Sequence, residues 1–164
     1  MNWMLIKHIV EAKRRGLLRL VGADSPTRLD CLADKCALCC KTLGAPVLTS
    51  EEAARIPDEL IVRAKSGLFV KSHNYTCCIL KDGLCSLYKD RPKGCREYPW
   101  YNIDGKLYYD SGCPGIKHDR DERPPLESIQ PFTNFFPDAS RLTLWLLRKL
   151  LISRRTTDVP ARIP

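Results

Sequence analysis

The cysteines of this chain are the residues whose type and spacing point most directly to chemistry. Nine of them occur within 164 residues. Thiolate sulfur is a soft ligand that selects zinc, copper(I) or iron–sulfur clusters over hard ions such as magnesium. We therefore expect these clustered thiols to bind metal. Seven of them are the predicted ligands: Cys36, Cys39, Cys40, Cys77, Cys85, Cys95 and Cys113.

Spacing within the cysteine set supports this prediction. Cys36 and Cys39 are separated by two residues, a spacing that lets the backbone turn around one metal. Cys77 and Cys78 are adjacent, and adjacent side chains of an extended strand point to opposite faces. One member of that pair is therefore expected to be a ligand. The same argument applies less firmly to Cys39 and its neighbour Cys40.

The number of thiols bears on the kind of metal. One zinc ion takes four protein ligands, and this chain offers more than four thiols. The surplus favours an iron–sulfur cluster, such as a 4Fe-4S cluster, over zinc, although a second metal site would also use it. Zinc stays the alternative cofactor.

Two arginines flank one of the predicted ligands. Arg91 and Arg96 lie on either side of Cys95. A guanidinium group stays charged and offers planar donors, so it suits thiolates or a bound carboxylate, and we expect both arginines near the cofactor. The sequence leaves the catalytic residues unknown, and it disfavours a Cys–His hydrolase because no histidine accompanies a lone reactive cysteine. The histidines are expected in surface or core roles: His8, His73 and His118.

The charge balance limits the kinds of partner. The chain has 27 Lys and Arg against 19 Asp and Glu, a formal net charge of +8. A basic chain favours acidic partners, namely a protein, an anionic membrane surface or nucleic acid, of which nucleic acid is not favoured here. No stretch has the apolar length of a membrane span. The first residues lack the features of a secretory signal, so we expect a cytoplasmic protein with reduced thiols.

Helices are predicted at both ends of the chain. Apolar residues at helical spacing predict an amphipathic helix over 3–21, and a broader apolar face predicts another over 138–155. We expect the C-terminal helix to pack against the N-terminal one. The alternative is that its broad apolar face docks on a protein partner or a membrane surface.

A capping signal marks a further helix. Thr49 precedes an acidic segment and Glu52 follows three residues later, which is the pattern of a capping box. We expect a helix over 49–66 that is interrupted at Pro57 and closed by Gly67.

Two Asp-Gly pairs, at 82–83 and 104–105, lie between apolar runs and predict short β-hairpins. Together the elements predict a single α+β domain. Its centre is a small, irregular, cysteine-rich core over 30–117 that is stapled by metal, and an amphipathic helix flanks this core at each end.

The order of these motifs resembles the YkgJ-like cysteine-cluster family, a family described as zinc- or iron-chelating with a CxxCxxCC signature. The resemblance covers 31–116, and its clearest segments begin at Cys36, at Arg91 and at Cys113. The signature would place its first cysteine at position 33, where this chain has Ala33, and Cys31 lies two residues earlier.

The resemblance also implies an alternative function. One relative in the family, the flagellin lysine N-methylase, is described as pairing an iron–sulfur cluster with S-adenosylmethionine. By analogy this chain would be a protein-modifying enzyme that transfers methyl groups, although no Gly-rich loop after a strand supports that. A third hypothesis is a zinc-stapled interaction module that binds a protein, a membrane surface or nucleic acid through its basic helices.

Overall fold

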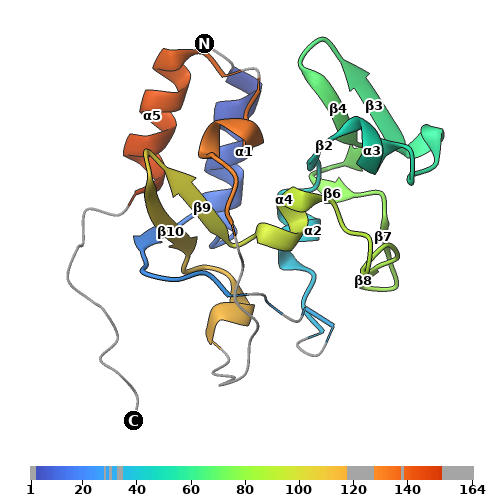
Figure 1. The fold of residues 1–164 in the computed structure, drawn as a ribbon, viewed down its shortest axis with the longest axis horizontal. Helices are drawn as coiled ribbons and strands as arrows, with labels where there is room; N and C mark the ends of the chain where they lie inside the picture. The colour runs from blue at the N-terminus through green and yellow to red at the C-terminus, as the bar shows by residue number, and fades with distance from the viewer. Residues whose placement is uncertain are drawn as a thin grey trace.

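The structure is a computed structural model that describes residues 3–27, 29, 31–32, 35–117, 128–137 and 139–152. It contains helices and small antiparallel sheets of two or three strands, so the predicted α+β class is confirmed. The elements form two halves, with two short helices between them (Figure 1).

The first half combines both ends of the described chain with a hairpin from its middle. Its strand order is β1-β10-β9, and Leu20 lies opposite Asp110 in the register. Two helices and a 3₁₀ turn pack on this sheet. The elements are α1 (Trp3–Arg14), β1 (Leu20–Gly22), β9 (Trp100–Ile103), β10 (Lys106–Asp110), η3 (Phe132–Phe135) and α5 (Arg141–Leu151).

The predicted packing of the terminal helices against each other is confirmed. Ile9 of α1 and Leu147 and Leu151 of α5 are buried in one apolar cluster, which we call the first core. Lys13 also donates a hydrogen bond to the carbonyl of Leu150. The burial of these side chains is the main source of stability for this half.

The second half is made of short strands. Its three-stranded sheet has the order β2-β4-β3, and two ribbons of two strands follow it. A second core is built from buried residues that include Leu48, Val70 and Ile79. The elements are β2 (Val47–Leu48), α3 (Ser50–Ala53), η1 (Asp58–Leu60), β3 (Ile61–Ala64), β4 (Gly67–Val70), β5 (Ser72–His73), β6 (Thr76–Cys77), β7 (Leu80–Lys81) and β8 (Leu84–Cys85).

Three short helical elements complete the fold. In Figure 1, α2 (Leu38–Thr42) and α4 (Lys93–Glu97) lie between the two halves. The third, η2 (Pro114–Lys117), follows the end of β10. The helices α2 and α4 carry three of the predicted ligands, Cys39, Cys40 and Cys95, so these three lie where the halves meet.

The N-terminal helix is shorter than the predicted 3–21. It ends at Arg14, because Gly16 takes a left-handed conformation with φ of +89° and the chain turns back. Leu17 and Leu20 are buried as predicted, but from a loop and from β1.

The predicted helix over 49–66 is present only as one turn before Pro57, α3, and one 3₁₀ turn after it, η1. The capping box is present, since the Thr49 hydroxyl accepts from the Glu52 amide and the Glu52 carboxylate accepts from the Thr49 amide. The helix nevertheless ends at Ala53, and β3 pairs with β4 where helix was expected. Gly67 begins β4 and does not close a helix.

Both predicted hairpins are confirmed. Asp82 and Gly83 connect β7 to β8, and Asp104 and Gly105 connect β9 to β10. All four residues have positive φ, as a two-residue type I′ turn requires.

The C-terminal helix begins later than the predicted 138–155. Ser140 is its N-cap and accepts a hydrogen bond of 3.2 Å from the Thr143 amide. Asp138 and residues 153–155 lie outside the described residues. Within the described part of the chain, no helix combines the length and apolar character needed to cross a membrane.

Candidate metal centre

One small pocket gathers thiols from across the chain. Its cavity measures about 40 Å³, and apolar side chains such as Ile79 and Leu84 form much of the rest of its wall. The turn before α2, α2 itself, β6, β8 and α4 all contribute sulfur atoms. The cysteines that line it are Cys31, Cys36, Cys39, Cys40, Cys77, Cys85 and Cys95.

The helix α2 presents two consecutive thiols to this pocket. The sulfurs of Cys39 and Cys40 are 4.0 Å apart, and both residues line the cavity. The predicted opposite-face argument does not hold for this pair, because consecutive residues of a helix are rotated by about 100°, not 180°. Just before α2, the Cys36 amide donates a 2.9 Å hydrogen bond to the Cys31 carbonyl and closes a turn.

The ribbons of the second half present one thiol each. Cys77 lines the pocket whereas its neighbour Cys78 does not. The thiol of Cys77 accepts a hydrogen bond from the amide of Ile79, and that of Cys85 accepts one from the amide of Leu87. In both turns the donor lies two residues after the cysteine, and such bonds favour the thiolate form that a metal needs.

Burial governs the protonation of most of these thiols. Removal from water raises the pKa of Cys77 to about 11 and raises that of Cys95 further above its ordinary value. Cys40 differs, because a hydrogen bond from Cys39 and the charge of Arg91 hold its pKa at about 7. In the metal-free protein the buried thiols are therefore protonated near neutral pH, and metal binding has to release those protons.

Two cysteines lie differently from the prediction. Cys113 follows β10, is buried and does not line the pocket. Its thiol accepts hydrogen bonds from the amides of Gly115 and Ile116, and burial raises its pKa to about 12. Cys31, which was not among the predicted ligands, does line the pocket. Its displacement from the signature position was the signal against it, and its distance of only five residues from Cys36 was the signal in its favour.

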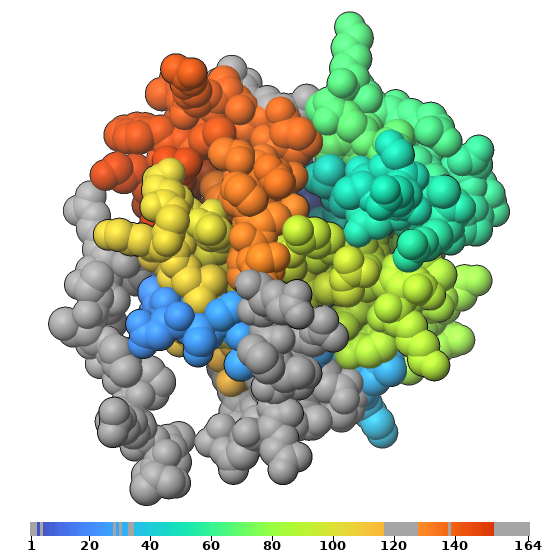
Figure 2. Space-filling model, viewed as in Figure 1, coloured from blue at the N-terminus to red at the C-terminus, as the bar shows by residue number. Residues whose placement is uncertain are grey.

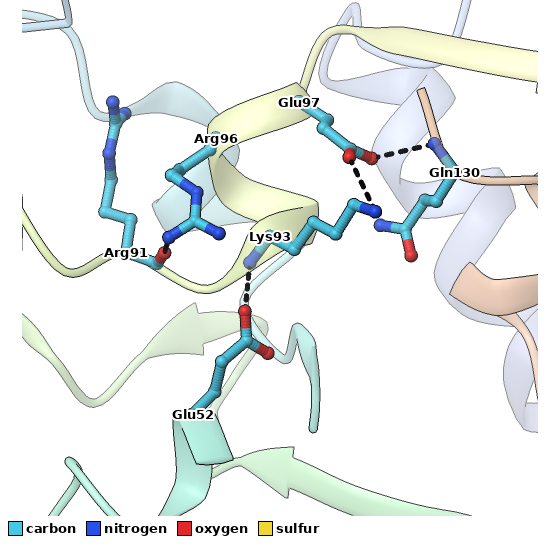
Figure 3. A network of polar contacts seen from close by, with 6 residues as sticks. All are labelled: Glu52, Arg91, Lys93, Arg96, Glu97 and Gln130. Atoms are coloured by element: carbon cyan, nitrogen blue, oxygen red, sulfur yellow. Dashed lines mark hydrogen bonds and ion pairs between the residues drawn. The ribbon is translucent and has the colours of Figure 1, made fainter. Parts of the chain in front are cut away.

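The two arginines have different positions. A terminal guanidinium nitrogen of Arg91, Nη1, lies 3.7 Å from the Cys31 sulfur, while its Nε donates to the Tyr88 carbonyl and its plane lies over the Tyr88 ring. Arg96 does not line the pocket. Its Nη1 donates a 2.9 Å hydrogen bond to the Arg91 carbonyl (Figure 3). Arg91 therefore faces the thiols directly, and Arg96 supports the backbone that carries it.

A polar network holds α4 from both sides (Figure 3). The carboxylate of Glu52 accepts from the amide of Lys93, and Glu97 accepts a 3.1 Å bond from the amide of Gln130. The Lys93 ammonium lies 3.6 Å from the buried Glu97 carboxylate. Because α4 carries Cys95, these contacts fix one wall of the pocket relative to both halves.

The histidines stand apart from the pocket. His8 packs edge-on against the Tyr75 ring at 4.7 Å, and His73 is exposed on β5. Neither residue lines the cavity. His118 lies outside the described residues.

The donor set fits a thiophilic metal, although the sulfurs have not closed around one point. Among the described residues, no three His, Cys, Asp or Glu side chains are placed to hold an ion as they stand. The cavity of about 40 Å³ is large enough for an ion, because a single water needs only about 10–15 Å³ by this measure. It is far below the roughly 300–1,000 Å³ of small-molecule pockets, so nothing in it supports S-adenosylmethionine.

Comparison with known proteins gave one match. A model of the CxxCxxCC family, described as "Putative zinc- or iron-chelating domain", matches residues 30–114. That stretch is more than half of the chain and includes all nine cysteines. A search of curated proteins and a search of solved structures gave no match.

Proposed function

The chain belongs to the CxxCxxCC family of zinc- or iron-chelating domains, and from this premise we propose that its clustered thiols are the metal ligands. The observation that carries the proposal is the pocket, where cysteines from position 31 to position 95 line one small cavity. All nine cysteines are free thiols, so each is available as a ligand. The proposed ligands are the seven predicted from the sequence together with Cys31.

We propose an iron–sulfur cluster as the bound form and zinc as its alternative. Seven thiols line the pocket, and the family description includes iron as well as zinc. A 4Fe-4S cluster and a structural zinc ion each take four cysteines, so either form leaves thiols over. The chain's own groups would serve either form. The amides of Ile79 and Leu87 donate to ligand sulfurs, and Arg91 lowers the local negative charge.

Anaerobic purification followed by metal and acid-labile sulfide analysis tests this proposal. A brown protein with iron and sulfide in similar amounts is expected. Zinc without sulfide would favour the alternative form, and a protein that neither contains nor takes up zinc or iron would contradict the proposal altogether. The matched control is Cys78→Ser, which should keep the full metal content because Cys78 is not among the proposed ligands and does not line the pocket.

We also propose that the two halves work as one domain in a reducing compartment such as the cytoplasm. The network around α4 supports the first point, since Glu52 and Gln130 hold that helix from opposite halves. The free thiols support the second, because clustered cysteines persist unoxidised where glutathione and thioredoxin keep them reduced.

A second candidate function rests on the outer face of α5. Leu142, Trp145 and Leu150 are 60%, 52% and 45% exposed, an unusual density of large apolar side chains on a surface helix. Arg141 and Lys149 are exposed beside them. The helix lies at an edge of the molecule, away from the strands of the second half (Figure 2). We propose that this face binds an acidic protein partner, because its charge is basic and its centre is apolar.

The double variant Leu142→Glu with Trp145→Glu tests the second function. It should abolish the binding of a partner identified by crosslinking, while the metal content stays at the wild-type level. The matched control is Val62→Glu, which changes an exposed apolar residue of the other half. Unchanged binding in the α5 variant would contradict this function, and binding to anionic vesicles or nucleic acid alone would replace it.

A further inference from the structure

The pocket offers a metal ion sulfur and little else. Besides its seven cysteines, the described residues that line it have apolar side chains, except for Tyr88 and Arg91. None of these lining side chains is a carboxylate or an imidazole, the groups that add oxygen and nitrogen ligands to many zinc and iron sites. A guanidinium group has no lone pair to give to a metal. The side chains of the pocket therefore form a soft donor set dominated by sulfur.

We propose that this pocket also binds copper(I), and that it holds several copper ions at once in one thiolate cluster, an inference that rests on the proposed metal-binding function. Thiolate is a ligand that selects copper(I), and this ion is satisfied by two or three thiolates. No electron moves, since the ion enters as copper(I), and each S–H proton that a copper–sulfur bond replaces passes to the solvent. Copper(I) competes with zinc or iron for the thiols of the pocket: Cys31, Cys36, Cys39, Cys40, Cys77, Cys85 and Cys95.

The number of thiols in the pocket favours more than one copper ion. A zinc ion or a 4Fe-4S cluster takes four cysteines, which leaves three of the seven pocket thiols without a metal. Copper(I) ions need fewer sulfurs each, and one thiolate can bridge two of them. A cluster of copper ions therefore uses the whole set of thiols, whereas one zinc ion uses only part of it.

The volume of the cavity agrees with several small ions. It measures about 40 Å³, roughly three times the 10–15 Å³ that one water molecule requires. A copper(I) ion is no larger than a water molecule, so about three ions fit in this space. The thiols face it from the turn before α2, from α2 itself, from two ribbons and from α4. Sulfur ligands are therefore available on several sides of the cavity.

The thiols of Cys39 and Cys40 already have the separation of two ligands on one ion. Metal–sulfur bonds are about 2.3 Å long, so two sulfurs on one ion lie at most about 4.6 Å apart. The 4.0 Å between these two sulfurs corresponds to a sulfur–metal–sulfur angle of roughly 120°. That is the angle of three-coordinate copper(I), and it is wider than the roughly 109° of tetrahedral zinc.

Arg91 supplies a positive charge that singly charged ions leave wanting. A copper(I) cluster keeps a net negative charge whenever its thiolates outnumber its ions. The Nη1 atom of Arg91 lies 3.7 Å from the sulfur of Cys31, and its Nε donates to the Tyr88 carbonyl. The guanidinium is therefore held beside the thiols, where it offsets their charge without acting as a ligand.

Anaerobic titration of the chelator-stripped full chain with copper(I) tests this inference, with the free copper buffered by the coloured chelator bathocuproine disulfonate. At least two ions per chain should bind in one cooperative step, because bridging thiolates link the ions. The loaded protein should show the orange luminescence of copper(I)–thiolate clusters that are shielded from water. A single ion per chain, or ions that bind one after another without luminescence, would overturn the proposed cluster.

Variants test whether the copper lies in the pocket. Cys40→Ser with Cys85→Ser removes two of the lining thiols and should lower the number of copper ions and abolish the cooperative step. The matched control is Cys78→Ser, which should bind copper like the wild type because Cys78 does not line the pocket. An unchanged titration of the double variant, or an equal loss in the control, would overturn the assignment to the pocket.

A labelling experiment decides the matter if the double variant does not fold. Wild-type protein is alkylated with and without copper(I), and the labelled cysteines are identified by mass spectrometry. The seven pocket cysteines should gain protection on loading, while the labelling of Cys78 stays the same. Protection gained by Cys78 and not by the pocket cysteines would overturn the inference.

Competition separates this inference from the proposed function. Copper(I) should release zinc from the zinc-loaded protein, as read with a zinc indicator. Retention of zinc at saturating copper would place the copper on other thiols and overturn the shared pocket, while the proposed function stands. Protein that takes up neither zinc nor iron would instead end the proposed function, whatever the copper titration shows.

Discussion

The carboxylate of Glu52 accepts a 2.6 Å hydrogen bond from the backbone amide of Lys93, 41 positions further along the chain. Lys93 is the first residue of α4, and its amide belongs to the group that has no partner within a helix. The N-cap of that helix, Pro92, offers no side-chain acceptor. Glu52 therefore caps the helix that carries Cys95, while its other oxygen completes the capping box of α3.

Glu52→Ala should lower the free energy of unfolding by about 1–2 kcal/mol, because it removes the acceptor from two helix starts. The expected fall in melting temperature is roughly 2–8 °C. Glu52→Gln should lose less, since the amide oxygen still accepts. The control is Glu51→Ala at the adjacent exposed position, and an equal loss in both alanine variants would refute the capping role.

Arg91→Gln should weaken metal binding by about tenfold, because the guanidinium beside the thiols is replaced by a neutral group. Competition with a chelator of known affinity measures the change. Arg96→Gln is the matched comparison, and its effect should be smaller because that side chain touches only the Arg91 carbonyl among these groups. An effect of Arg96→Gln as large as that of Arg91→Gln would show that charge near the thiols is not what matters.

His8 should make the protein less stable in mild acid. Burial lowers the pKa of His8 below its ordinary value of 6.5, and the charge of Arg15 acts in the same direction, while a bond to the Thr42 backbone opposes both. The unfolded chain therefore binds a proton more readily than the folded one, so stability falls as the pH drops below about 6.5.

Comparison with His8→Gln isolates this contribution. Denaturant unfolding between pH 5 and pH 8, with the metal content kept equal, should show the wild type losing more stability than the variant below pH 6.5. Parallel pH profiles for the two proteins would rule out the predicted role of His8.

Gly112→Ala should destabilise the protein by roughly 1–3 kcal/mol. A Cβ atom at this position would lie 1.9 Å from the carbonyl oxygen of Gly16, and backbone atoms cannot be moved aside cheaply. Gly22→Ala is the matched control, since a Cβ there meets nothing within 4 Å. Thermal unfolding distinguishes them, and similar melting temperatures for the two variants would contradict the close approach.

The features that could be predicted from the sequence are those decided by neighbouring residues. The hairpin at Asp104 and Gly105 and the capping box of Thr49 depend on residues at most a few positions apart, and both are present. The apolar periodicity gave a wrong helix end, because buried residues of a loop or a strand can continue the same spacing. Leu17 and Leu20 fit the apolar stripe of the N-terminal helix, but the left-handed turn at Gly16 takes them into a loop and a strand.

The missed strand β3 has a different cause. Ile61 and Val62 are both β-branched, and β-branched residues favour strands. Their pairing with β4 outweighed the helix that the capping signal led us to expect. The same limit applies to the metal centre. Cysteine type and spacing indicated the ligands, but the position of Cys31 in the pocket and of Cys113 outside it depends on how distant segments pack.

The two cores differ in how much of the chain each one needs. The second core is formed by residues between Leu48 and Ile79, and all nine cysteines have been synthesised once Cys113 is reached. The first core joins Ile9 to Leu151, and β1 touches Ile152 beyond α5. At about 5–20 residues per second, a ribosome needs several seconds to pass from one point to the other. During translation the second core can therefore form first, with all nine cysteines already synthesised, and the first core, which contains both terminal helices, closes last.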